Sequence, residues 1–389
     1  MMGFERMLGV GVAVAMVAVC NGEWADPPYP TDQAENPVLT QIAAIDITDP
    51  PMINLSPLNI QKEGVISAGC SHAGDFAHQM HITWSSLVGG ACVFSGQPYH
   101  CAAKMFPGDE LVEASVESSV PNCDGCPDGK TLVYDHCKNH PEWVDVGMLP
   151  DYPRRICGQN PITKTECIDD VENLRDDRVY LFRPTHDRCY RTGAVANVQA
   201  LYGQMLNSPQ QQIKFVNDQP FPHTLPTNST PYFNHSNPAG FDGPGECLRW
   251  VFPGVQWAGE FKATNVFTFD QTKYMDDNGV GINKKGFVYI PERCKNANTG
   301  VSCRMVLLAN GCTGFGGGDI DWAKYGEAND IVILKPCVGG YVNATRFPQA
   351  HEVQRGLLDV YGQLTEEYVM QSAPHMKFMG KVLKAITGW

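Results

Sequence analysis

Short apolar runs alternate with helix-like segments from residue 64 to the end of the chain. The runs that predict strands are 64–68, 87–94, 178–182, 213–216, 286–290, 305–309 and 330–334. The helix-like segments are 74–80, 194–206, 322–327 and the last forty residues. Apolar strands separated by helices are typical of a mostly parallel sheet with both faces covered. We therefore expect an α/β fold in which residues 62–389 form a single domain.

Two segments do not follow this pattern. Residues 21–61 are rich in proline and irregular, and we expect them to form an extension packed over the domain. Residues 102–170 contain five cysteines, many prolines and little periodicity, which indicates a Cys-rich insertion held by disulfides rather than a layer of the sheet. We find no internal repeat and no linker that would separate a second domain.

The first twenty residues have the pattern of a secretory signal peptide. An uninterrupted run of apolar residues and glycine from Met7 to Val19 follows a short segment that contains Arg6. This run is too short to span a bilayer comfortably, and small or polar residues follow it. We therefore predict that residues 1–20 are a signal peptide and that the protein is secreted, without membrane insertion.

The cysteine count agrees with an oxidising compartment. Cys20 lies in or beside the signal, which leaves fourteen of the fifteen cysteines, an even number suited to disulfides. The pair Cys123 and Cys126 could suggest zinc, but no matching pair of cysteines or histidines completes a tetrahedral site, so we expect no metal. Four possible glycosylation sequons also fit secretion, at Asn54, Asn228, Asn234 and Asn343.

The charge of the chain excludes one class of partner. A formal net charge of −13 argues against nucleic acid, because nucleic-acid binding needs a concentrated basic surface. Charged residues make up only 18% of the chain. The remaining polar composition is typical of an extracellular protein and does not indicate a substrate or an oligomeric state.

The candidate chemistry begins at the pentapeptide 69–73, Gly-Cys-Ser-His-Ala. It follows an apolar run and precedes a helix-like segment. A strand, a sharp turn with serine at its apex and then a helix form the nucleophile elbow of the α/β-hydrolases. Small residues are required beside the serine because the turn is strained, and Ala73 is one methyl group larger than the usual glycine. Ser71 is therefore the candidate nucleophile.

Two loops after later strands supply possible partners for this serine. Ser71, Asp187 and His223 occur in the hydrolase order, each after the carboxyl end of an expected strand, where open α/β sheets bind their ligands. His223 would accept the hydroxyl proton, and Asp187 would orient the imidazole. Chain order alone leaves this choice open, since His186 lies beside Asp187, Asp218 lies near His223, and the chain has eleven histidines.

Several motifs resemble those of one family. The stretch 69–101 is similar to the secreted poly(3-hydroxybutyrate) depolymerases, whose elbow reads Gly-Leu-Ser-[Ser/Ala]-Gly-Gly-Tyr-Met-Ala. The counterparts of the family's next motifs are Gln79-Met80, Trp84-Ser85 and 96–102, Gly-Gln-Pro-Tyr-His-Cys-Ala. The segment 222–227, Pro-His-Thr-Leu-Pro-Thr, resembles the family's catalytic histidine segment. Further matches are 179–182 with Asp187, 247–252, 286–291, and Cys294 with Cys303.

The resemblance spans roughly residues 62–340 and implies a fold and a site. It implies an α/β-hydrolase sheet, the triad Ser71, Asp187 and His223, and a disulfide between Cys294 and Cys303. It also implies an oxyanion hole formed by the backbone N–H groups of His72 and Cys312. In hydrolases the second donor usually precedes the nucleophile. Because Cys312 follows all three triad residues, the resemblance implies a circularly permuted sheet.

The sequence departs from the family at three positions near the site. His72 and Ala73 replace small residues of the elbow, and Asn310 replaces the histidine of the oxyanion turn. The family's aromatic Cys-Trp-Asp-Trp segment has no clear counterpart after residue 337. We therefore keep three hypotheses. The first is a secreted serine esterase that cleaves poly(3-hydroxybutyrate)-like or short hydroxyalkanoate esters without a cofactor. The others are a decayed extracellular binding protein on a hydrolase scaffold and an esterase for feruloyl or other polyester linkages.

Overall fold

The computed structural model describes residues 49–101, 137–138, 141–144, 146–148, 167–227, 240–296, 300–309, 315, 318–348 and 350–389. The predicted signal peptide, most of the extension and most of the Cys-rich insertion lie outside the described residues. Residues Thr40–Trp389 group into one compact unit. Within the described residues, no helix is long and apolar enough to cross a membrane.

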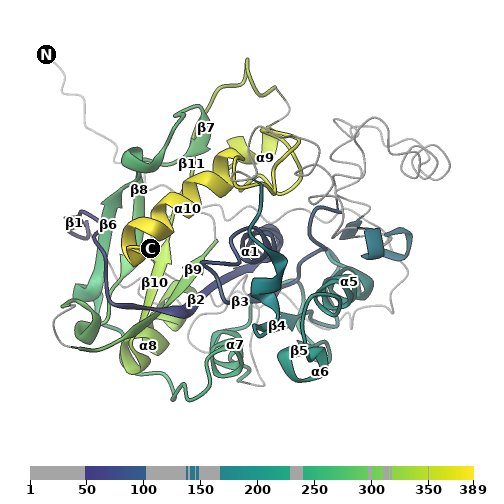
Figure 1. Cartoon of the computed structure of the whole chain (residues 1–389), viewed down its shortest axis with the longest axis horizontal. Coiled ribbons are helices and arrows are strands. Elements are labelled where there is room, and N and C mark those ends of the chain that lie inside the picture. Colours follow the sequence, from purple (N-terminus) through teal and green to yellow (C-terminus); the bar gives the residue numbers. More distant parts are fainter. Residues whose placement is uncertain are drawn as a thin grey trace, which may run out of the picture. The chain divides into compact units, whose positions relative to one another are not determined.

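A nine-stranded sheet forms the centre of the fold, in the order β1-β6-β8-β10-β9-β2-β3-β4-β5 (Figure 1). Only β8 runs antiparallel to its neighbours, so the mostly parallel sheet predicted from the sequence is confirmed. The strands are β1 Met52–Ile53, β2 Ile60–Cys70, β3 Gly90–Phe94, β4 Arg178–Phe182, β5 Ile213–Val216, β6 Val266–Asp270, β8 Lys285–Tyr289, β9 Cys303–Leu308 and β10 Ile331–Lys335. A separate two-stranded sheet pairs β7 Val280–Ile282 with β11 Val338–Val342.

Helices cover both faces of the large sheet. Alternate residues of β2 enter opposite cores, with Val65 in one hydrophobic cluster and Ile66 in the other, as expected for a strand. Helices α1 and α10 pack on the Val65 side, through residues such as Phe76 and Val382. On the Ile66 side α7 and α8 pack against the sheet. The helices are α1 His72–Thr83, α5 Thr192–Tyr202, α6 Pro209–Gln212, α7 Gly243–Val251, α8 Gly318–Asn329, α9 His351–Gln354 and α10 Pro374–Thr387. Short 3-10 helices are η2 Pro141–Trp143, η3 Val146–Met148, η4 Val171–Leu174, η6 Ala263–Asn265, η7 Gln271–Tyr274 and η8 Glu292–Cys294.

The strand order confirms the permuted arrangement. Strand β2, which ends one residue before Ser71, is the first long strand in the chain yet lies inside the sheet. Its neighbour on one side is β3, and its neighbour on the other side is the late strand β9. The strand that a hydrolase usually places ahead of the serine therefore follows it in this chain.

The C-terminal region differs from its prediction as a continuous helix. Only α9 and α10 are helical after β11, and residues 355–373 form turns between them. Gly356 and Gly362 have φ values of 91° and 92°, in the left-handed region that a helix cannot use. Pro374 then begins α10, a position where proline is favoured.

Strand β6 was not predicted, because its sequence Val-Phe-Thr-Phe-Asp is only partly apolar.

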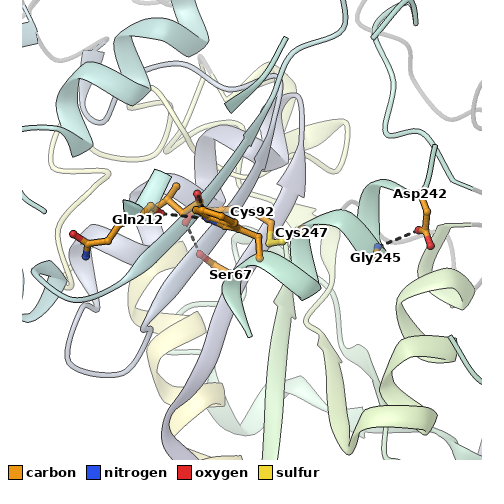
Figure 2. The surroundings of a disulfide bond; sticks show 9 residues. Ser67, Cys92, Gln212, Asp242, Gly245 and Cys247 are labelled. Carbon is orange, nitrogen blue, oxygen red and sulfur yellow. Dashed lines mark hydrogen bonds between the residues drawn. A yellow bond between two sulfur atoms is a disulfide. The ribbon is translucent and has the colours of Figure 1, made fainter. Parts of the chain in front are cut away.

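Disulfides connect the sheet to its surroundings. Cys92 of β3 is bonded to Cys247 of α7, which ties that helix to the sheet (Figure 2). At the start of the same helix, the Asp242 side chain accepts from the backbone N–H of Gly245. The predicted bond between Cys294 and Cys303 is confirmed. Cys101 is bonded to Cys137, and three further cysteines are disulfide-bonded, Cys167, Cys189 and Cys337.

Helix α1 buries a histidine whose protonation opposes folding. Within the described structure, neither ring nitrogen of His78 has a hydrogen-bond partner, and its ring packs edge-on against Tyr99 and Tyr202. Burial, with a smaller effect of His81, lowers the pKa of His78 to about 3. Burial also lowers the pKa of His100 to about 3. Both side chains are therefore neutral in the folded protein at pH values where the unfolded chain is protonated.

We predict that the free energy of unfolding falls as the pH drops below about 6.5, the ordinary histidine pKa, and keeps falling toward pH 3. The unfolded state binds more protons in this range, so acid favours it. The substitution His78→Leu should reduce the slope by about one proton, or roughly 1.4 kcal/mol per pH unit. Urea unfolding at pH 7, 6 and 5 measures the slope. The control is Met80→Leu, a volume-conserving change at another buried position of α1 that removes no titratable group and should leave the slope unchanged. An unaltered slope in His78→Leu contradicts the prediction.

Candidate active site

Ser71 occupies a sharp turn between β2 and α1. Its φ and ψ are 62° and −130°, a conformation that non-glycine residues rarely adopt. Its backbone N–H donates to the carbonyl oxygen of Phe94, at 2.7 Å, which ties the turn to the end of β3. The strand, strained serine turn and helix expected of a nucleophile elbow are all present.

The small residues around Ser71 are explained by close backbone approach. A Cβ atom on Gly69 would lie 2.1 Å from the carbonyl oxygen of Ala73, so only glycine fits there. A Cβ atom on Gly74 would lie 2.9 Å from the carbonyl oxygen of Phe94. The methyl group of Ala73 itself is buried in the hydrophobic core. Alanine is therefore accommodated at the position where the motif usually has glycine.

The loops after β4 and β5 run side by side and bring Asp187 to His223. A parallel bridge pairs His186 with Pro222, and the His186 N–H donates to the carbonyl oxygen of Phe221 at 3.1 Å. His223 Nδ1 lies 2.9 Å from Asp187 Oδ2. An ionised carboxylate can only accept, so Nδ1 carries the proton and Nε2 is left as an acceptor. An imidazole in this tautomer can remove a proton from a hydroxyl group.

Asp187 is buried and held by several donors. Its Oδ1 accepts hydrogen bonds from the backbone N–H groups of Cys189 and Tyr190, at 2.8 and 2.9 Å. Burial by itself would raise the pKa of Asp187. The charge and hydrogen bond of His223, with a further hydrogen bond from the Tyr190 backbone N–H, outweigh burial and lower this pKa below its ordinary value. Asp187 is therefore a carboxylate at neutral pH.

The pairs that chain order left open are resolved by geometry. His186 is exposed, and its backbone N–H joins the two loops. Asp218 is also exposed, and its Oδ1 accepts from the neighbouring Gln219 side chain. Asp187 and His223 are thus the carboxylate and imidazole that meet in these loops.

Ser71 lies at the same edge of the sheet as this pair. It follows the carboxyl end of β2, and Asp187 and His223 follow the carboxyl ends of β4 and β5. Ser95 is buried at the end of β3, the strand between β2 and β4. Within the described residues no hydrogen bond joins the Ser71 hydroxyl to His223. Such contacts are often long before substrate binds.

The free thiol of Cys70 does not compete with Ser71. Burial, and then the negative charges of Asp187 and Asp75, raise the pKa of Cys70 far above its ordinary value. A thiol must ionise to act as a nucleophile or metal ligand. Cys70 therefore stays protonated.

One cluster has spacing that would suit a metal ion. Ligand atoms of Asp187, Cys189 and His223 lie within 4.8 Å of one another. Cys189 is disulfide-bonded, so its sulfur is not a thiolate ligand. The other two side chains already share a hydrogen bond. The cluster fits a carboxylate–imidazole pair better than a metal site.

Comparisons with known proteins agree with the fold and the motifs. The poly(3-hydroxybutyrate) depolymerase of Delftia acidovorans is 24% identical over 307 residues, an alignment that covers 73% of this chain and 54% of that protein. This chain is similar to poly(3-hydroxybutyrate) depolymerases. It spans about half the length of the curated relative that it matches. The resemblance predicted from the motifs is confirmed, although no protein-family model matches the sequence.

Two solved structures of poly(3-hydroxybutyrate) (PHB) depolymerases share this fold. One is the enzyme from Penicillium funiculosum, with a TM-score of 0.62, and the other is a PHB depolymerase complexed with an R3HB trimer, with a TM-score of 0.63. Each is 18% identical and covers 86% of this chain and 99% of the solved chain. The α/β-hydrolase-like fold class is therefore confirmed.

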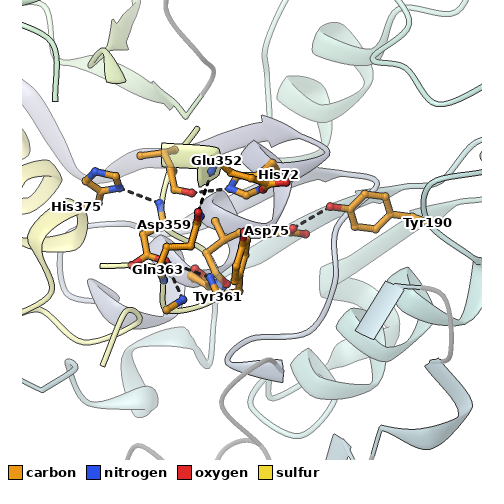
Figure 3. A network of polar contacts seen from close by, with 12 residues as sticks. His72, Asp75, Tyr190, Glu352, Asp359, Tyr361, Gln363 and His375 are labelled. Atoms are coloured by element: carbon orange, nitrogen blue, oxygen red, sulfur yellow. Dashed lines mark hydrogen bonds and ion pairs between the residues drawn. The ribbon is translucent and has the colours of Figure 1, made fainter. Parts of the chain in front are cut away.

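His72, an expected oxyanion donor, is the first residue of α1. Backbone N–H groups in the first turn of a helix have no partner inside the helix, and the helix dipole favours negative charge there. The side chain of His72 is buried against the C-terminal region, where Nε2 donates to the carbonyl oxygen of Leu358 at 2.5 Å (Figure 3). The second expected donor, Cys312, and the substituted Asn310 lie outside the described residues.

The C-terminal region supports the side chain of His72. Its Nδ1 lies 3.4 Å from Glu352 Oε2, and its ring meets Tyr361 edge-on. Burial lowers the pKa of His72 although Glu352 opposes this effect. Asp359 fixes the following turn by accepting from the backbone N–H groups of Gly362, Gln363 and Leu364.

Sequence reasoning missed three residues around the site. Glu352 was placed in an expected C-terminal helix. Tyr190 follows Asp187 closely but carries no motif. Asp75 offered the clearest signal, because it is an acidic residue within a segment predicted to be a buried helix, and such residues are rarely buried without a partner.

We predict that His72→Ala lowers the free energy of unfolding by about 1–3 kcal/mol, because the buried carbonyl of Leu358 loses its donor. His72→Gln should restore part of the loss, since an amide can donate to the same carbonyl. Urea unfolding at pH 7 measures both. The exposed His351 supplies the control variant His351→Ala, which should match the wild type. Equal stability of His72→Ala and the wild type would contradict the contact's role.

Proposed function

We propose that this chain is a serine esterase that hydrolyses poly(3-hydroxybutyrate)-like polyesters or short hydroxyalkanoate esters through an acyl-enzyme. The observation that carries the proposal is the buried hydrogen bond between Asp187 and His223, at the sheet edge where Ser71 occupies a strained turn. The similarity to a poly(3-hydroxybutyrate) depolymerase and the R3HB trimer bound to a structural neighbour support the substrate class.

The first half of the reaction forms the acyl-enzyme. Ser71 Oγ attacks the ester carbonyl carbon while His223 Nε2 takes the hydroxyl proton. Asp187 stabilises the imidazolium that results. The negative charge on the carbonyl oxygen is held by the backbone N–H groups of His72 and Cys312, and losing one such donor typically costs about 3–4 kcal/mol of transition-state stabilisation. The tetrahedral intermediate then expels the alcohol, which leaves with the proton from His223.

The second half releases the acid. Water attacks the acyl carbonyl, and His223 takes one of its protons. The intermediate breaks the bond to Ser71, whose oxygen regains a proton from His223. The carboxylic acid leaves and the enzyme returns to its starting state. The whole reaction needs no cofactor. We propose that it takes place outside the cell, because the predicted signal peptide and the disulfides favour secretion.

We predict that a fluorophosphonate probe labels Ser71 and that Ser71→Ala lowers turnover of p-nitrophenyl butyrate by a factor on the order of 10⁶. Labelling followed by peptide mapping identifies the residue. The control is Ser85→Ala. The Ser85 hydroxyl donates to the carbonyl oxygen of Asp170, away from the strand ends that carry Ser71, Asp187 and His223, so turnover should not depend on it. Folded protein that is neither labelled nor active would instead support the decayed binding protein. Faster turnover of feruloyl esters than of butyrate esters would support the third hypothesis.

We predict that Asp187→Asn lowers kcat by about 10⁴-fold while the fold is kept, because an amide stabilises the wrong imidazole tautomer and not the imidazolium. The measurement is kcat for the butyrate ester, with circular dichroism as a check on folding. Asp218→Asn is the matched control, since Asp218 is an exposed carboxylate on the loop of His223. Similar kcat values for the two variants would remove Asp187 from the triad.

A further inference from the structure

Tyr190 lies flat against the imidazole of His223. The two ring centroids are 5.5 Å apart and the ring planes differ by only 6°. Tyr190 is 2% exposed, so the stack is inside the protein. Offset parallel packing of aromatic rings at this distance is attractive and restricts rotation of both rings. One face of the proposed base is therefore fixed by an aromatic side chain.

The other end of Tyr190 contacts the helix that follows Ser71. Its phenol hydroxyl donates to Asp75 Oδ2 at 2.8 Å (Figure 3). Asp75 is fully buried in the first turn of α1, and its backbone N–H donates to the carbonyl oxygen of Ser71 at 3.0 Å. The second carboxylate oxygen of Asp75 accepts from the backbone N–H of Gln97 at 2.8 Å.

The backbone of Tyr190 is held to Asp187. Its N–H donates to Asp187 Oδ1, at 2.9 Å. The guanidinium of Arg183 donates to the carbonyl oxygens of Tyr190 and Asp187, at 3.1 and 2.9 Å. Tyr190 thus has one contact with the carboxylate, one with the imidazole and one with the serine helix.

We propose that Tyr190 is a positioning residue that sets the His223 imidazole against Ser71, with Asp75 as its anchor. The inference rests on the proposed function for its kinetic consequence. The hydrogen bond to Asp187 fixes only one corner of the imidazole, and the ring can still tilt about it. The stack removes this tilt, and the hydroxyl contact with Asp75 ties the stack to the helix that begins after Ser71.

Burial of Asp75 is explained by the same contacts. Moving a carboxylate out of water is unfavourable by several kcal/mol unless donors replace the water. Asp75 has two such donors, the Gln97 N–H and the Tyr190 hydroxyl. The donor from Tyr190 belongs to the loop of Asp187, 115 residues later in the chain. This buried acid therefore links the serine turn to the loop that carries its partners.

The kinetic test compares Tyr190→Leu with Tyr190→Phe. The first loses the stack and the hydroxyl, and we expect kcat to fall by up to about 10²-fold, as for a small misplacement of a catalytic group. KM should stay within about twofold, since Tyr190 is not proposed to bind substrate. Tyr190→Phe keeps the stack and should recover kcat to within roughly tenfold of the wild type.

A buried tyrosine away from the site gives the matched control. Tyr202 is fully buried on α5, and its hydroxyl contacts His81 Nδ1 at 2.7 Å. Tyr202→Leu and Tyr202→Phe should lower Tm as the Tyr190 variants do, without changing kcat. If Tyr190→Leu loses stability but keeps the wild-type kcat, Tyr190 is only a structural residue and the inference is overturned.

A spectroscopic readout separates this inference from the proposed function. The proton shared by His223 Nδ1 and Asp187 should give a far-downfield proton NMR signal. We expect the signal in the wild type and Tyr190→Phe, and its loss by exchange in Tyr190→Leu. An unchanged signal in Tyr190→Leu overturns the positioning role, whether or not the protein hydrolyses esters. If the wild type does not hydrolyse esters but Tyr190→Leu loses the signal, the proposed function is overturned and the positioning role of Tyr190 is kept.

Discussion

The site depends on the strained turn at Ser71. A non-glycine residue at φ 62° is unfavourable by itself and persists only where the surroundings fix it. Three features do so here. Strand β2 is buried between two cores, the N–H of Ser71 is bonded to the end of β3, and Gly69 allows the helix backbone to approach. If any of these is lost, the serine can relax into an ordinary turn and its direction relative to His223 is no longer defined.

The order of strands in space, not in sequence, assembles the rest of the site. Parallel strands present their carboxyl ends at one edge. Ser71, Ser95, Asp187 and His223 therefore lie along the same edge, because β2, β3, β4 and β5 are consecutive neighbours in the sheet. The late strand β9 completes the other side of β2. A circular permutation changes the order in which the chain visits the strands but keeps these neighbours, so the strand ends that carry Ser71, Asp187 and His223 stay at one edge of the sheet.

Features set by local pattern could be predicted from the sequence, and features set by distant contacts could not. The strand ends that carry Ser71, Asp187 and His223 are visible as apolar runs followed by loops, and their pairing was a prediction that chain order left open. The irregular C-terminal region was readable in part, since Gly356 and Gly362 interrupt the helical pattern. The contacts of Tyr190 with Asp75 and of His72 with Leu358 join residues far apart in sequence. An acid in a buried helix indicates that Asp75 needs a donor, but the local sequence does not identify Tyr190 as that donor.

Negative charge surrounds the serine turn at this edge of the sheet. Burial raises the pKa of the Cys70 thiol beside Ser71, and the charges of two buried carboxylates, Asp187 and Asp75, raise it further. Negative charge around the turn opposes a second anion there, so the thiol stays neutral. Asp187 contacts His223 directly, and Asp75 is linked to His223 through Tyr190. In the reaction that we propose, His223 becomes positive as it takes the serine proton, and the carboxylate in contact with it stabilises that charge. In the same proposal the anionic oxygen is held at the first turn of α1, where the helix dipole favours negative charge.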